Sequence, residues 1–434
     1  MTTKYFQGSL NAANGNPIRI SYPDTDTNSD TTIEKHAQQE QIIEQSSTRR
    51  IFQLIFITLS FIGIGLNDSA TGSNLNNIQE KYGLSFKDAS FFFLSNAGGY
   101  AISSVCTVHI MYYFGVPLTT FVSAMIYSGG ALLTAFAPPF PAMVVSLFLQ
   151  GVGSGILDAS ATSVLALIAS SSVLSRVYAS FSFGSMISPF IIGAFSQYNL
   201  TWHYFYFFPM SLGVILCSTS LFIFKGFLLP KKKKEFDVGV NDGLKSVLSK
   251  KVAWLSLILV LMTNSHQCIN SQWMPSFLLY KGYKDETSTY VVAGFWGGVT
   301  IGRLAGPTVF KKVLEKFRNL ALVVVATALL GVIWGVENIA VRAVCLSLTG
   351  LCWGPLIPAS IDIGVTRLPQ HETPIIAPLI IGSGLIGASF APFLFSFAAE
   401  TFTAKILPGV LVVIAGLEFI LFVFVPSKSQ SDEF

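Results

Sequence analysis

The sequence predicts an all-α membrane protein with twelve transmembrane helices in two pseudo-symmetric bundles of six helices. Three observations predict this fold: the composition, the number of long apolar stretches and an internal repeat. Of the 434 residues, 51% are hydrophobic and only 12% are charged, about half the charged share of an average soluble domain. Since a soluble globule of this length needs far more charge to cover its surface, most of the chain must face lipid.

Twelve stretches are long and apolar enough to cross a bilayer, which takes ~20 residues of helix. Six fall within residues 51–229, near 51–75, 89–110, 116–136, 141–168, 176–197 and 203–229. Six more fall within residues 252–426, near 252–279, 288–310, 319–336, 339–365, 373–398 and 404–425. The predicted domains are therefore a polar, disordered N-terminal tail at 1–50, these two bundles, a basic linker at 230–251 and a C-terminal tail at 427–434.

Basic residues near the ends of the predicted spans fall mostly on one side of the membrane. That side carries Arg49 and Arg50, the lysines of the linker, and the basic residues at 311–318. Because cytoplasmic loops are enriched in Lys and Arg, we expect both termini and the linker to be cytoplasmic. The lysine run at 231–234 is expected to contact anionic lipid. The plasma membrane is favoured over an internal membrane.

An internal repeat relates the two predicted bundles at a constant offset of 199 residues. Gly98-Gly99 matches Gly297-Gly298, and Asn67-Asp68 aligns with His266-Gln267. The fourth and tenth spans match at two further glycine pairs, Gly151 with Gly350 and Gly155 with Gly354. Two homologous halves of this kind are typical of transporters that expose a central site to each side of the membrane in turn.

Two carboxylates lie within the predicted spans, where even the most lenient scale puts the cost of a charge at ~2.5 kcal/mol. Asp68 is either a residue at a loop edge or part of a site. Asp158 is deeper, and it shares a stripe with Ser154 and Thr162 at a spacing of four residues. It is either a protonated residue bonded inside a helix contact or the carrier of a coupling proton. We favour the second, because burial lets a carboxyl exchange a proton near neutral pH.

The seventh predicted span turns polar in its second half. His266, Asn270 and Trp273 fall on one helical face, with Gln267 beside them. Amides and an indole suit a polyhydroxylated ligand, which offers hydroxyls for hydrogen bonds and an apolar ring face. With Asn67 and Asp68 they form the predicted substrate pocket. The alternative for His266 is a hydrogen-bonded core residue.

Other polar or aromatic residues of the spans have weaker assignments. Asn96 and Trp296 either line the pocket or pack between helices. Arg303, deep in the eighth span near its cytoplasmic end, either pairs with a carboxylate or binds an anionic substrate, or, as we favour, snorkels toward the membrane surface or locks a gate. Glu418 lies in the middle of the last span with no assigned role.

Other classes of function find no support in the sequence. The five cysteines lie in apolar runs without metal-ligand spacing or paired bases, and no Walker-type loop occurs. A net charge of +4 without a basic groove pattern argues against nucleic-acid binding. We therefore expect neither an enzyme nor a cofactor or metal.

Over residues 51–425 the chain resembles the major facilitator superfamily, and within it the fucose–proton symporter family and its eukaryotic sugar-transporter relatives. The similar motifs are Gly65-Leu66-Asn67-Asp68, the run Gly151 to Ala159, and Gly297 to Arg303. The resemblance implies substrate recognition and proton coupling by acids at Asp68 and Asp158. Many relatives have a glutamate where this chain has Gln267, which implies that the C-terminal half binds substrate without titrating. The usual basic loop motif is reduced to Gly115 within residues 110–117.

The sequence thus predicts a monomeric secondary transporter that moves a small polar solute, with a sugar favoured, together with protons. Asp158 would carry the proton and Asp68 would assist or bind substrate. Two alternatives stay open: a proton-driven antiporter that exports an organic anion or drug through Arg303 or His266, and a non-transporting nutrient sensor.

Overall fold

The computed structural model describes residues 10–11, 17–18, 47–168, 171–227, 240–309, 313–369 and 372–426. Two compact units are distinguished, Met1–Ser47 and Thr48–Phe434. In the first, β1 (Leu10–Asn11) and β2 (Pro17–Ile18) pair antiparallel, and the sequence between them contains Asn14-Gly15, a hairpin signal. The prediction of a disordered tail at 1–50 therefore lies largely outside the described residues. Within the described residues, the prediction did not include the β1–β2 strand pair.

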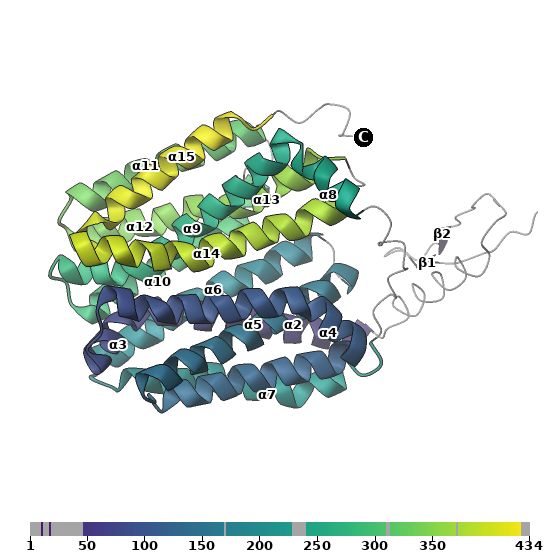
Figure 1. Cartoon of the computed structure of the whole chain (residues 1–434), viewed down its shortest axis with the longest axis horizontal. Helices are drawn as coiled ribbons and strands as arrows, with labels where there is room; N and C mark the ends of the chain where they lie inside the picture. The colour runs from purple at the N-terminus through teal and green to yellow at the C-terminus, as the bar shows by residue number, and fades with distance from the viewer. Residues whose placement is uncertain are drawn as a thin grey trace, which may run out of the picture. The chain divides into compact units, whose positions relative to one another are not determined.

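The first predicted bundle is formed by residues 47–223 (Figure 1). Its helices are α2 (Ser47–Ser73), α3 (Leu75–Tyr82), α4 (Phe86–Ala135), α5 (Phe140–Ile168), α6 (Ser171–Gln197), η1 (Trp202–Tyr206) and α7 (Phe207–Ile223). Two predicted spans fall within α4, which is broken at Gly115 by a non-helical conformation (φ 72°, ψ 167°). A positive φ suits glycine, and Pro117 lies two residues after the break.

The second predicted bundle begins at Lys251. Its helices are α9 (Lys251–Tyr280), α10 (Asp285–Val309), α11 (Glu315–Gly335), α12 (Ile339–Trp353), α13 (Leu356–Thr366), α14 (Thr373–Phe402), η3 (Ala404–Ile406) and α15 (Leu407–Val423). One predicted span is divided between α12 and α13 at Gly354-Pro355, where proline removes a backbone donor. The predicted linker contains α8 (Val240–Leu248), while its lysine run at 231–234 lies outside the described residues.

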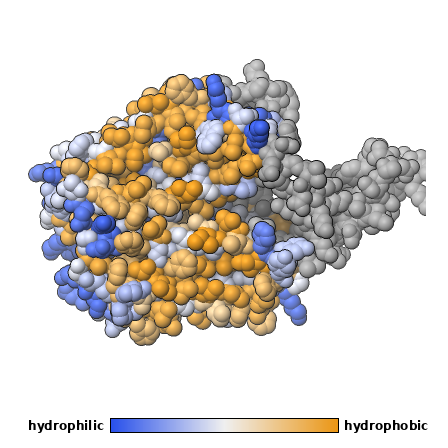
Figure 2. Space-filling model, in the orientation of Figure 1, coloured by the Kyte–Doolittle hydropathy of each residue, from blue (hydrophilic) through white to orange (hydrophobic). Residues whose placement is uncertain are grey.

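All twelve predicted spans coincide with helical segments in the structure. Ten of these segments are long and apolar enough to cross a membrane; the first part of α4 and α10 are helical but fall outside that criterion. Figure 2 shows apolar residues gathered over the middle of the helices, with hydrophilic residues toward both ends. This is the surface of an integral, multi-pass membrane protein.

The repeated glycines mark equivalent helix crossings in the two halves. A Cβ added at Gly99 would collide with the carbonyl of Phe148, and one added at Gly298 would collide with that of Ser347. Both members of each contact differ by the offset of 199 residues. The same holds for the contacts of Gly151 with Asn96 and of Gly350 with Phe295. The predicted repeat is confirmed, because the same close crossing joins α4 to α5 and α10 to α12.

The two halves meet where the end of α2 and the start of α3 lie against α9, at nearly equivalent positions of the repeat. Gly72 lies against Gln272, and the hydroxyl of Ser276 donates to Asn76 Oδ1 at 3.1 Å. We call the end of the bundles near Ser47 and Leu248 the linker end, and the other end the far end. Among the described residues, most hydrogen bonds between the halves lie in the half of the bundles toward the far end, including Asn77–Asp285, Gln197–Tyr290 and Lys87–Glu400. The halves are therefore held together at the far end.

Candidate functional site

Asp158 lies at a close crossing of α5 and α4. Gly155 packs directly against the backbone of Tyr100, and this approach brings the phenol to the carboxylate. Tyr100 donates a hydrogen bond to one carboxylate oxygen, and Thr162 donates to the other at 3.2 Å. Asp158 itself is half-buried. Both of its oxygens therefore have hydroxyl partners, which is the condition under which a carboxylate is tolerated away from water.

Arg303 joins this site from the other half of the molecule. Its guanidinium donates to the carbonyl of Tyr178 at 3.2 Å and to the hydroxyl of Ser182 at 2.6 Å. It also lies 5.9 Å from the ring centroid of Phe181, within cation–π distance. The Tyr178 hydroxyl is 3.3 Å from that of Thr162. A chain of polar contacts thus runs from Asp158 on α5 through α6 to α10.

Asp68 lies beside these residues on α2. The position of α2 is fixed by close packing against α6, because Gly65 contacts the backbone of Phe181. The opposite charges of Asp68 and Arg303 attract each other, and Gln272 of α9 donates to the Asp68 carbonyl at 2.8 Å. We call Asp68, Tyr100, Asp158, Thr162, Tyr178, Ser182 and Arg303 the polar cluster. It brings together three of the residues predicted from the sequence, Asp68, Asp158 and Arg303.

Three predicted amide residues are buried with unsatisfied atoms. Asn67 Oδ1, Gln267 Oε1 and both polar atoms of the Asn270 side chain have no hydrogen-bond partner among the described residues. Buried polar groups in native proteins are nearly always paired with protein, water or ligand. These atoms lie on α2 and α9.

Trp273 does not join these amides. Its indole N–H donates to the Pro392 carbonyl at 3.1 Å, and its rings pack against Phe86, Phe93 and Phe395 at 5.2–5.7 Å. The contacts belong to an aromatic core toward the far end. The predicted pocket role of Trp273 is unsupported, because α9 is buried on all sides in this stretch and a shared helical face does not define one cavity.

His266 is also turned away from Asp68, into its own bundle. Its ring stacks on Trp353 with centroids 3.7 Å apart, and its Nδ1 is 3.5 Å from Glu418 Oε2. The side chains of His266 and Glu418 are both 0% exposed. The structure thus places His266 beside Glu418 in the core of the second bundle, although neither ring nitrogen has a hydrogen-bond partner among the described residues.

Asn96 and Trp296 have different surroundings. Asn96 donates to the Leu147 carbonyl at 3.2 Å and so links α4 to α5. Trp296 is fully buried against Phe181, with ring centroids 6.0 Å apart, and its indole N–H is unpaired. Since Phe181 also contacts Arg303, Trp296 lies next to the polar cluster, whereas the described contact of Asn96 is with α5.

Three residues of the polar cluster, Tyr100, Tyr178 and Ser182, were not predicted from the sequence. Tyr100 follows the repeated Gly98-Gly99 pair, so the glycine pattern could have indicated that it faces α5. Tyr178 lies in an apolar helix without such a signal. Within the described part of the chain, no group of three or more His, Cys, Asp or Glu could hold a metal ion.

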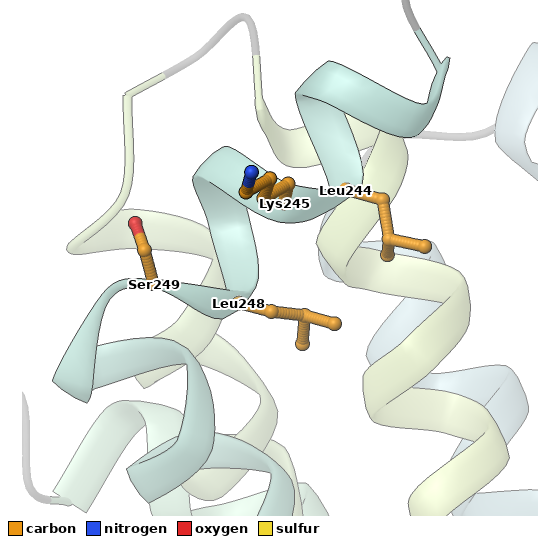
Figure 3. A pocket seen from close by; sticks show the side chains of 4 residues that line it. All are labelled: Leu244, Lys245, Leu248 and Ser249. Carbon is orange, nitrogen blue, oxygen red and sulfur yellow. The ribbon is translucent and has the colours of Figure 1, made fainter.

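Surface hollows lie elsewhere. One of about 470 Å³ is lined by Leu244, Lys245 and Leu248 of α8 and by Ser249, which directly follows the helix, and Figure 3 shows both leucines pointing to the same side of this helix. Another lies between α10 and α12 and is lined in part by Tyr290, Gly294 and Ser347. Neither contains a residue of the polar cluster.

Comparison with known proteins agrees with this architecture. The family model of the major facilitator superfamily matches residues 57–392. The chain is 22% identical over 409 residues to Bypass of stop codon protein 6 of Saccharomyces cerevisiae, covering 85% of this chain and 82% of that protein. In fold it resembles a crystal structure of the nucleoside transporter NupG, with a TM-score of 0.70 at 10% identity, over 86% of this chain and 98% of that one. The helical architecture and the family match together establish that this chain belongs to the major facilitator superfamily and is a membrane transporter.

Proposed function

We propose that this protein is a secondary active transporter that moves a small polar solute together with protons, with a sugar as the favoured solute. The observation that carries the proposal is Asp158, a half-buried acid within a membrane span whose two oxygens accept hydrogen bonds from Tyr100 and Thr162. An acid in such surroundings can gain and lose a proton without a large rearrangement.

The surroundings of Asp158 also provide a route from protonation to movement. Ionised Asp158 accepts hydrogen bonds at both oxygens, but the protonated acid must donate through one of them. Thr162 or Tyr100 then has to reorient. Since Thr162 contacts Tyr178, and the Tyr178 carbonyl accepts from Arg303, the change reaches the second half of the molecule. Protonation is thereby linked to the contact between the halves, as alternating access requires.

The favoured solute follows from the unpaired groups near the polar cluster. The Asn67, Gln267 and Asn270 side chains offer both donors and acceptors, the combination that binds hydroxyl groups. Trp296 adds an unpaired indole N–H, and its ring packs against Phe181. A neutral, polyhydroxylated solute satisfies these groups without bringing a charge into the membrane. The resemblance to the fucose–proton symporter family supports the same class.

Uptake into liposomes containing the purified protein tests this proposal. With an inward proton gradient, the wild type is expected to concentrate a labelled sugar, whereas Asp158→Asn is expected to equilibrate it at most. Asp88→Asn, which removes an exposed carboxylate at the start of α4, is the matched control and should behave as wild type. Concentrative uptake by Asp158→Asn would show that the coupling proton is carried elsewhere.

Export of an organic anion is a second candidate, carried by Arg303. Its guanidinium donates only to neutral oxygens in the described contacts, so a substrate anion could compete with Asp68 for its charge. Counterflow with preloaded sugars and organic acids separates the two functions. Exchange of organic acids, abolished by Arg303→Gln and independent of sugars, would favour export.

A further inference from the structure

His266 and Glu418 form a buried pair that the proposed function does not use. The pair lies inside the second bundle, with His266 on α9, Glu418 on α15, and 3.5 Å between Nδ1 and Oε2. We propose that it is a second proton-binding site, which holds one proton as an imidazolium–carboxylate pair and gives the second half its own part in coupling. The existence of this proton site does not depend on the proposed function, whereas the part of the site in coupling rests on that function.

The charge balance of the site argues for one bound proton. Both side chains are 0% exposed, and an isolated charge is very costly in such surroundings. With no proton the pair has a net negative charge, and with two protons a net positive charge. A single proton leaves the pair neutral overall, so this state is the most stable.

The aromatic neighbour determines where that proton is held. The His266 ring stacks on the indole of Trp353, with centroids 3.7 Å apart and planes 32° from parallel. An aromatic face of tryptophan attracts a cation. The imidazolium form of His266 is therefore favoured, with Glu418 as its carboxylate partner.

Other charged groups do not replace either partner. His266 is the charged group that acts on Glu418 in the described part of the chain. Charged residues on the packed helices are engaged elsewhere: Arg303 of α10 with Tyr178 and Ser182, Glu315 and Arg318 of α11 with Arg367 and Asn319, Arg342 of α12 with the Ile333 and Val336 carbonyls, Asp362 of α13 with Arg367, and Glu400 of α14 with Lys87. On α9 itself, Cys268 faces the charge of Asp68. The pair is thus a self-contained site.

The pair is well placed to affect the substrate site. His266 directly precedes Gln267, and Asn270 lies one turn further along α9. Further along, Gln272 donates to the Asp68 carbonyl in the other half. Loss of the proton would remove the attraction between α9 and α15 and leave α9 free to shift, with the unpaired amides and the contact to Asp68 shifting with it.

Fluorescence of the purified full-length protein tests the proton site directly. A protonated imidazole quenches a stacked indole strongly, whereas a neutral one does so weakly. The Trp353 contribution is obtained by subtracting the spectrum of Trp353→Phe. At neutral pH it is expected to be quenched in the wild type and to rise in Glu418→Gln, because His266 loses the carboxylate that holds its proton. Equal Trp353 emission in the two proteins would overturn the proposal.

Infrared spectroscopy provides an independent measurement if Glu418→Gln does not fold. In His266→Gln, Glu418 has no cation beside it and must take up the proton itself. An additional protonated-carboxyl stretch is therefore expected in His266→Gln relative to the wild type, and it should be lost again when Glu418→Gln is added. A wild type that already shows this band, unchanged in His266→Gln, would contradict an imidazolium–carboxylate pair.

The part in coupling is tested by counting protons per solute in liposomes. Glu418→Gln is expected to carry fewer protons per solute than wild type while still transporting, and an unchanged ratio would overturn this part of the proposal. Proton-driven accumulation by Asp158→Asn would instead refute the role of Asp158 and leave the fluorescence result standing. The two failures are therefore distinguishable.

Discussion

The two halves of this transporter use equivalent positions of the repeat in different ways. In the first half, Asp68 on α2 belongs to the polar cluster and attracts Arg303 from the other half. In the second half, His266 on α9 aligns with Asn67 but turns into its own bundle, toward Glu418 and Trp353. The helix crossings are conserved between the halves while the acid–base groups are not. Backbone symmetry and chemical asymmetry are therefore separable features of this fold.

The largest expected effect comes from blocking the contact between the halves at Gly72. A Cβ there would lie 2.6 Å from the Cα of Gln272, so Gly72→Leu cannot reach the arrangement in which the far end is closed. We expect loss of transport in liposomes with the protein still folded. Gly98→Leu is the control, since no atom lies within 4 Å of a Cβ at Gly98. Normal transport by Gly72→Leu would mean that α2 and α9 do not need to meet here.

The equivalence of the two bundles is tested by the glycines at the repeated crossing. Gly99→Ala and Gly298→Ala each push a Cβ into a backbone carbonyl, and overpacking of this kind costs about 1–3 kcal/mol. Both variants should lower the thermal unfolding temperature to a similar extent. Gly129→Ala, where a Cβ meets open space, should leave it unchanged or raise it. A large effect in one half alone would break the structural equivalence.

A smaller effect is expected for the hydrogen bond that distinguishes the first half. Thr162→Val keeps the shape of the side chain but removes the donor to Asp158 at 3.2 Å. The loss of one such bond is worth roughly 1 kcal/mol, or about fivefold in an equilibrium. Proton-driven uptake should fall by about this factor, and Thr162→Ser should restore it. If Thr162→Ser transports no better than Thr162→Val, the hydroxyl is not the relevant group.

The smallest expected effect is the pH dependence of closure at the far end of the bundles. Asp285 precedes its predicted span, and burial raises its pKa above the ordinary value of 3.8, although hydrogen bonds from Ser196, Asn77 and Asn76 partly oppose this. Opening the far end would expose Asp285 and return its pKa toward that value. The closed arrangement therefore binds the proton more tightly, so acid favours closure and closure weakens as the pH rises from 3.8 through the raised pKa.

Spin labels at Lys81 and Lys284, on exposed positions beside this contact, measure the opening of the far end. The population of short distances should grow on acidification in the wild type. Asp285→Asn should abolish this pH dependence and resemble the acidic form. If the population of short distances in Asp285→Asn responded to pH as in the wild type, the pH dependence would come from another titratable group.

Much of the fold could be predicted from the sequence because each signal is local. Span length and apolar composition indicate helices in a bilayer, and all twelve predicted spans are helical. The glycine repeat could be predicted because a close crossing needs small residues at fixed positions along each helix. The break at Gly115 and the division at Gly354-Pro355 depend on backbone conformations that apolar composition does not report.

The site was only partly predictable. Asp158 and Asp68 stood out because a carboxylate within a span is rare and costly. Trp273 and His266 share a helical face in the sequence pattern, but they meet different neighbours in the structure, because their helix is buried all round. Tyr178 gave no signal, since its role depends on where α10 places Arg303.

By itself, the sequence determined that this chain is a two-bundle membrane protein with charges buried in its spans, because the bilayer imposes helix length, apolarity and the cost of charge on each segment separately. Only the tertiary structure decided which buried groups meet: Asp158 with Tyr100 and Thr162, and His266 with Glu418. The residues of each such set lie on different helices or on different turns of one helix. Their meeting is therefore set by how helices cross and rotate, which periodicity along one segment does not contain.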